Sequence, residues 1–135
     1  MKYLFLLAIF VQSASANLVQ KINLLLPALE AVESANDPLA IGDHGRAVGL
    51  LQHHEAYRTD VNKVYGARYT KADSFKTESA REITFFYLLF YGSQYEKVTG
   101  RPVSIEVLAR IHNGGPTGYL KRSTIKYWRK VKDVL

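Results

Sequence analysis

The sequence predicts a single, mainly α-helical domain (α or α+β class) with a small glycine-rich flap. Apolar residues between Leu18 and Val32 recur at steps of three and four, the pattern of one buried helix face. The run Ile83–Tyr91 is apolar or aromatic at nearly every position, which is typical of a helix buried on all sides. The intervening segment Leu39–Gln52 contains three glycines and predicts short strands at most. We therefore expect five to six helices around one central buried helix.

The start of the chain has the features of a secretory signal. Lys2 supplies a positive charge, Tyr3–Val11 forms an apolar core, and Ala14-Ser15-Ala16 is an A-x-A cleavage site. The apolar core is far shorter than the ~20 residues that a membrane-spanning helix needs. The sequence therefore predicts a signal peptide over residues 1–16, cleavage after Ala16, and a secreted domain over residues 17–135.

Composition limits the partners that this domain can have. The chain has no cysteine and a formal net charge of +6, and a domain of this size can build a core without disulfides. Basic residues are dense near the C-terminus, and such a surface attracts anionic polymers over long distances. Beyond charge there is no nucleic-acid signature. We expect a monomer that meets an anionic bacterial surface and binds no specific nucleic acid.

Proline and turn-forming residues mark the ends of the predicted helices. Pro27 either kinks the first helix or restarts it, and Asn36-Asp37-Pro38 is turn chemistry that ends this helix near Ser34. A second helix is predicted over residues 54–65, with one apolar side. Residues 67–76 are predicted to form a polar loop.

Caps and glycines place the last three helices. Thr77 is the expected N-cap of the central helix, which Gly100-Arg101-Pro102 ends. Ser104 is the expected cap of the next helix, and Gly114-Gly115-Pro116 stops it. Ser123 or Thr124 is expected to cap the last helix, in which Ile125, Trp128 and Val131 share one face.

Two carboxylates stand out beside the glycine-rich segment. Glu33 lies on the last turn of the first helix, and Asp43 follows ten positions later. One carboxylic acid and one carboxylate are the minimum for cleaving a glycosidic bond. A helix C-terminus disfavours an anion, which suits an acid that must stay protonated. Glu30, one turn earlier, and Asp37, before a proline, are the alternatives.

A set of motifs in fixed order points to a known family. Glu33-Ser34 follows an apolar helix, Gly49-Leu50-Leu51-Gln52 comes next, then Ala109-Arg110-Ile111-His112-Asn113-Gly114-Gly115-Pro116, and last Tyr127-Trp128-Arg129-Lys130-Val131. Over roughly residues 24–132 the sequence resembles invertebrate-type lysozymes and their lysozyme-like relatives. The resemblance implies a lysozyme-like fold with a small β-hairpin or flap. Animal members are rich in disulfides, so a cysteine-free chain favours a bacterial, phage or viral-like relative.

The resemblance also implies roles for individual residues. Glu33 would be the general acid and Asp43 the second catalytic carboxylate. Residues expected to bind substrate are Ser34, Gln52, Tyr57, His112, Asn113, Gly114, Gly115 and Tyr119. Tyr127 is a further candidate for stacking on sugars, although core packing of Tyr127 or Trp128 is favoured. His53-His54 lacks carboxylate or cysteine partners at ligand spacing, so no metal and no cofactor are predicted.

These expectations define a secreted muramidase that hydrolyses the β-1,4 bonds of peptidoglycan, with chitin as a second possible substrate. The alternative within enzymes is a lytic transglycosylase, which needs only the glutamate. A different class remains open as well: a catalytically silent, basic glycan- or wall-binding protein, or a membrane-disrupting protein. No Ser–His pairing is clear enough to predict isopeptidase activity.

Overall fold

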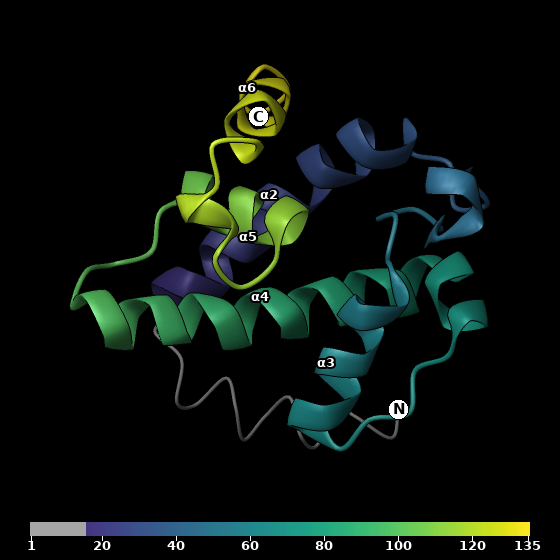
Figure 1. Cartoon of the computed structure of the whole chain (residues 1–135), viewed down its shortest axis with the longest axis horizontal. Coiled ribbons are helices and arrows are strands. Elements are labelled where there is room, and N and C mark those ends of the chain that lie inside the picture. The colour runs from purple at the N-terminus through teal and green to yellow at the C-terminus, as the bar shows by residue number, and fades with distance from the viewer. Residues whose placement is uncertain (1–15) are drawn as a thin grey trace.

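The computed structural model describes residues 16–135 and confirms the mainly helical class (Figure 1). The elements in this range are α2 (Ala16–Ser34), β1 (Ile41–Gly42), β2 (Ala47–Val48), α3 (Glu55–Tyr65), α4 (Thr77–Thr99), α5 (Ile105–Gly114) and α6 (Thr124–Lys132). The signal peptide predicted over residues 1–16 lies outside the described residues, except that Ala16 begins α2. Within residues 16–135 no helix is both long and apolar enough to cross a membrane.

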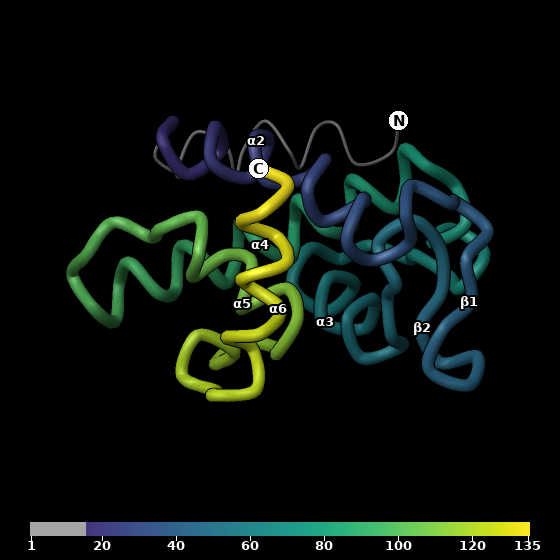
Figure 2. Tube along the Cα trace, turned by 90° about the horizontal axis from the view of Figure 1, so that it is seen from above, coloured from purple at the N-terminus to yellow at the C-terminus, as the bar shows by residue number. Residues whose placement is uncertain are grey.

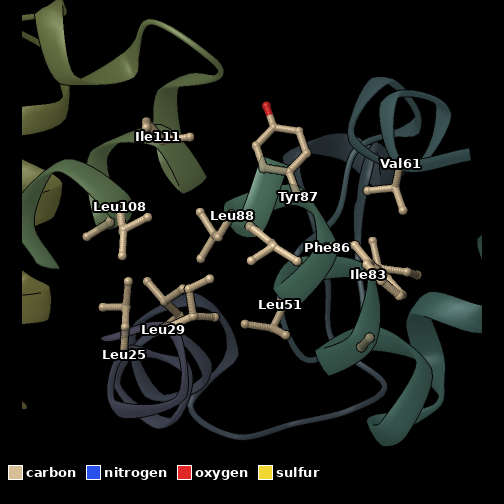
Figure 3. Close-up of a cluster of buried hydrophobic side chains, with 14 of the residues drawn as sticks. Leu25, Leu29, Leu51, Val61, Ile83, Phe86, Tyr87, Leu88, Leu108 and Ile111 are labelled. Carbon is tan, nitrogen blue, oxygen red and sulfur yellow. The ribbon is translucent and has the colours of Figure 1, made fainter. Parts of the chain in front are cut away.

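The long helix α4 is the centre of the fold, as the sequence predicts. It runs across the molecule in Figure 1, and α2, α3 and α5 pack against it. Figure 3 shows the shared core, in which Leu88 of α4 lies on the side of Leu29 and Leu108, and Phe86 lies on the side of Val61 of α3. Tyr87 stands at the edge of this cluster with its hydroxyl pointing away from it. The face of α4 that carries Tyr87 therefore packs in the core on one side and borders the cleft described below on the other.

The first helix continues through Pro27 to Ser34, where the sequence predicts its end. Leu25 and Leu29, on either side of the proline, are completely buried, so packing compensates for the backbone donor that proline lacks. Ala35 and Asn36 then adopt left-handed backbone conformations, with φ values of 53° and 64°. Left-handed residues cannot continue a helix, and this change of direction fixes Glu33 on the final turn.

Three details differ from the sequence predictions. Lys76, not Thr77, is the N-cap of α4, because the Lys76 carbonyl already accepts the first helical hydrogen bond from Ala80 N at 2.8 Å. Neither Ser123 nor Thr124 caps α6 with its side chain, since Thr124 Oγ1 donates to the Gly118 carbonyl instead. The loop at residues 67–76 contains a short 3₁₀ helix, Lys71–Phe75, that was not predicted.

The glycine-rich segment forms the small antiparallel hairpin that the resemblance implies. Ile41 pairs with Val48 and Gly42 with Ala47, and a 3₁₀ turn over Asp43–Gly45 joins the two strands. The hairpin lies at one end of the molecule, and the α4–α5 connection lies at the other (Figure 2). Ser34 Oγ donates to the Leu50 carbonyl at 2.8 Å, which ties the end of α2 to the segment that follows the hairpin.

Gly49→Ala is expected to destabilise the protein more than Gly45→Ala. Both glycines have positive φ, 81° and 87°, but a Cβ on Gly49 would lie 1.8 Å from the Ser74 carbonyl oxygen while one on Gly45 has open space. The first change should lower the free energy of unfolding by about 3 kcal/mol or more, and the second by about 1 kcal/mol. Chemical denaturation of both variants measures the difference, and equal losses would show that the contact with Ser74 is unimportant.

Candidate active site

A cleft of about 500 Å³ opens where the end of α2, the hairpin, α3 and the end of α5 meet. It is lined by Glu33, Asp43, Ala47, Gln52, His54, Ala56, Tyr57, Asp60, Tyr87, His112, Asn113, Gly115 and Pro116. Seven of the ten site residues that the sequence predicts are in this set. Both predicted carboxylates therefore face one concave space, although they come from different elements.

Glu33 is held in a shielded position by aromatic and imidazole groups. Its side chain is 17% exposed, and Tyr127 of α6 donates its hydroxyl proton to Glu33 Oε1 at 2.7 Å. His112 Nε2 lies 3.3 Å from the same oxygen. Burial, and then the neighbouring Glu33 carboxylate, raise the pKa of Tyr127 well above its ordinary value, so Tyr127 stays a neutral donor. Both neighbours converge on Oε1, and no other group in residues 16–135 forms a hydrogen bond or an ion pair with Oε2.

His112 and Tyr57 form a second layer behind the glutamate. Tyr57 OH and His112 Nδ1 share a hydrogen bond of 2.9 Å, and the Tyr57 ring stacks on Tyr87 with centroids 3.6 Å apart. Burial is the main cause that raises the pKa of Tyr57, with Tyr87 adding to it. If the neutral Tyr57 hydroxyl donates to Nδ1, the proton of His112 resides on Nε2 and faces Glu33. The imidazole is then fixed in one tautomer and one orientation.

Asp43 occupies a contrasting environment across the cleft. Its side chain is 40% exposed, Arg46 Nη2 lies 2.8 Å from Oδ1, and His54 Nε2 lies 3.5 Å from Oδ2. Asp43 and His44 both have left-handed backbone, with φ values of 47° and 55°. Such strain is costly in non-glycine residues and is concentrated at functional sites. The strained turn, Arg46 and His54 hold the Asp43 side chain at the open side of the cleft.

The two alternative carboxylates have other partners. Glu30 is 5% exposed and forms two hydrogen bonds with Arg81, of 2.6 and 3.1 Å, and it does not line the cleft. Asp37 Oδ1 accepts a hydrogen bond from Leu39 N at 2.9 Å, which is a turn role. The geometry therefore favours Glu33 over Glu30 and Asp43 over Asp37.

Three residues predicted to bind substrate lie outside the lining of the cleft. Ser34 is bonded to the Leu50 carbonyl. A Cβ on Gly114 would lie 2.6 Å from Thr124 Cγ2, so this glycine permits close packing of α5 against α6. Tyr119 packs edge-on against Tyr95, with centroids 5.0 Å apart. In this structure all three therefore have packing or hydrogen-bonding roles away from the cleft lining.

Sequence reasoning missed several residues at the site. Asp60 lies three positions after Tyr57 on α3, and this helical spacing could have found it, whereas Ala56 is adjacent to Tyr57 and gave no such signal. Tyr87 carried no signal, because it lies in a run where nearly every residue is apolar. The hydrogen bond from Tyr127 to Glu33 joins residues 94 positions apart, so no local pattern could reveal it.

The adjacent histidines point to different surroundings. His53 is completely buried, with its ring nitrogens bonded to Ser74 and Thr84 at 3.1 and 2.7 Å. Burial lowers the pKa of His53 well below its ordinary value, so the ring is neutral. His54 faces Asp43 instead. Across residues 16–135, no group of three or more histidine, cysteine, aspartate or glutamate side chains is placed to hold a metal ion.

Comparison with known proteins finds similarity to lysozymes. A lysozyme from Meretrix lusoria is 46% identical over 44 residues, which are 33% of this chain and 36% of that protein. Lysozyme 1 of Crassostrea virginica is 45% identical over 84 residues, 62% of this chain and 42% of that protein. The chain thus spans less than half the length of these curated relatives. No protein-family model matches the sequence.

Solved structures extend the similarity to most of the chain. An inhibitor-bound lysozyme from Meretrix lusoria has a TM-score of 0.66 at 29% identity, covering 82% of this chain and 87% of that one. Tapes japonica lysozyme has a TM-score of 0.63 at 25% identity, covering 79% and 85%. The predicted resemblance to invertebrate-type lysozymes and the lysozyme-like fold are confirmed. These relatives are bivalve proteins, so they lend no support to the expected bacterial, phage or viral-like origin.

Proposed function

We propose that the chain is a secreted glycoside hydrolase of the lysozyme type, which cleaves the β-1,4 bonds of bacterial peptidoglycan. The observation that carries this proposal is the pair of unlike carboxyl groups in one cleft: Glu33 is shielded and Asp43 is solvated and paired with a cation. Such contrasting environments divide the acid and carboxylate roles between two side chains. The sequence and fold similarity to lysozymes supports the same reaction and substrate.

Glu33 acts as the general acid in this mechanism. Oε1 already accepts from Tyr127 and faces His112, so the acidic proton is carried on Oε2. When a glycan lies in the cleft, Glu33 donates this proton to the glycosidic oxygen while the bond from C1 to that oxygen breaks. General acid assistance of this kind contributes roughly 10²–10⁴-fold to the rate.

Asp43 stabilises the positive charge that develops at C1. Arg46 and His54 hold its carboxylate at the open side of the cleft, where water has access. Asp43 serves either as a nucleophile, which gives retention, or as a base for water, which gives inversion. The anomer released first, observed by NMR, distinguishes these two routes.

Two other functions make different predictions for the products. A lytic transglycosylase uses Glu33 alone and releases 1,6-anhydro sugars, and a silent wall-binding protein releases nothing. Mass spectrometry of digested peptidoglycan separates these outcomes from hydrolysis. Reducing-end products support the proposal, whereas anhydro products or intact glycan contradict it.

Glu33→Gln is expected to abolish nearly all clearing of bacterial walls while the protein stays folded. The amide keeps the shape of the side chain but has no acidic proton, so activity should fall by at least about a hundredfold. Glu30→Gln is the matched control: it weakens the ion pair with half-exposed Arg81 and should cost about 1 kcal/mol of stability. Turbidity assays should show near-normal activity for the folded control, and the reverse ranking would make Glu30 the acid.

Asp43→Asn is expected to reduce hydrolysis strongly, because a neutral amide stabilises the developing cation poorly. The loss should reach roughly a hundredfold or more. Rates and products are measured together on purified peptidoglycan. If the rate stays within a few-fold of the native value, the two-carboxylate mechanism is wrong.

Tyr127→Phe is expected to lower the rate of hydrolysis while the protein stays folded. The lost hydroxyl donates to Glu33 Oε1, so the side chain of the acid loses a donor that fixes its orientation. A hydrogen bond to a charged group is worth about 1.5–3 kcal/mol, so kcat/KM should fall about tenfold or more. Hydrolysis of peptidoglycan by the folded variant measures this loss, and a normal rate would make Tyr127 a packing residue only.

A further inference from the structure

A second depression continues from the catalytic cleft along α3. Two hollows of about 340 and 370 Å³ adjoin through three shared lining residues, Glu55, Arg58 and Lys71. The smaller hollow also shares His54 and Ala56 with the cleft. We call these two hollows the basic groove. A chain bound in the cleft can therefore extend a side branch into this groove without leaving the surface.

Arg58 forms the floor of the groove and lacks the partner that a buried arginine usually has. It is 7% exposed, and its Nη1 donates to the His53 carbonyl at 3.2 Å and to Ser74 Oγ at 3.5 Å. No ion pair joins it to a carboxylate in residues 16–135. Buried charges are normally paired. Burial is the main cause that lowers the pKa of Arg58, and the charge of Glu55 partly opposes it. Binding of an anion would therefore stabilise the buried, positively charged guanidinium.

The other charges of the groove favour the same kind of ligand. The lining contains three cationic side chains, Arg46, Arg58 and Lys71, and one carboxylate, Glu55. Arg46 is engaged by Asp43. Lys71 is exposed, and its Nζ makes a long hydrogen bond of 3.4 Å to the Gly45 carbonyl. Arg58 and Lys71 thus remain to bind an anion, with Glu55 as a single opposing charge.

We propose that the basic groove binds a carboxylate on the side branch of a glycan held in the catalytic cleft. This inference rests on the proposed function and specifies its substrate. Alternate sugars of peptidoglycan carry a carboxylate, either on the lactyl group itself or, where a stem peptide is attached through that group, on the peptide, whereas chitin carries none. The groove selects the acidic, peptide-bearing polymer over chitin, because only the former supplies an anion to Arg58 and Lys71.

Binding is tested without turnover, in the Glu33→Gln protein. Calorimetry compares a peptidoglycan tetrasaccharide with free stem-peptide carboxylates and the same compound with those carboxylates converted to amides. The acid form should bind about tenfold more tightly, as expected for one or two charge-assisted hydrogen bonds. Lys71→Gln should reduce this preference to about threefold, and Arg58→Gln should remove it.

Lys63→Gln is the matched control, because Lys63 is an exposed lysine of α3 that lines neither hollow. It should leave the tenfold preference intact, and thermal melting checks that every variant is folded. The groove proposal is wrong if the acid and amide forms bind equally or if neither form binds. It is also wrong if Lys63→Gln and Lys71→Gln have an equal effect. Hydrolysis of peptidoglycan by the native chain is measured separately. If the chain cleaves peptidoglycan but binds the acid and amide forms equally, the groove proposal is wrong and the proposed function stands. If it prefers the acid form but cleaves nothing, the proposed function is wrong and the groove proposal stands.

Discussion

The burial of the middle of α4 is the constraint on which the rest of this structure depends. The buried residues of this helix lie between Ala80 and Gly92. An apolar helix segment of this kind must be covered by neighbours, and α2, α3 and α5 pack against it. The same requirement brings the end of α2 and the end of α5 toward one region. Tyr87 shows the connection directly, because it is 4% exposed in the core and also lines the cleft. The cleft is thus a consequence of how the core closes.

Support for the two carboxylates comes from different kinds of structure. Glu33 is positioned by the rigid interior: a helix end, the Tyr127 hydroxyl and a histidine fixed by Tyr57. Asp43 is positioned by a strained, exposed turn with a neighbouring arginine. The shielded group is held where water is scarce and the solvated group where water enters. The two environments suit two different roles: one carboxyl group must donate a proton, and the other must stay ionised to stabilise a cation.

The elements that local patterns determine could be predicted from the sequence. The end of α2 at Ser34 and the Ser104 cap follow from turn residues and helical spacing, and the short hairpin was implied by the family resemblance; the structure has each of them. Glu33 and Asp43 were identified from motif order, and the structure brings both to the cleft. What could not be predicted depends on contacts between distant segments. Tyr127 reaches Glu33 across 94 positions, and Ser34 turns to the Leu50 carbonyl instead of the cleft.

The way α6 is attached to the rest of the fold determines how the hydrogen bond between Tyr127 and Glu33 can be lost. Thr124 and Val131 of this helix are buried, and Tyr127 and Trp128 pack partly buried against the core. The helix α6 packs on α5 and α2, so a local opening of α6 removes the Tyr127 hydroxyl from Glu33 while the contacts of α2, α3 and α5 with α4 can persist. Competence for proton donation and integrity of the core are consequently separate thermodynamic quantities in this chain.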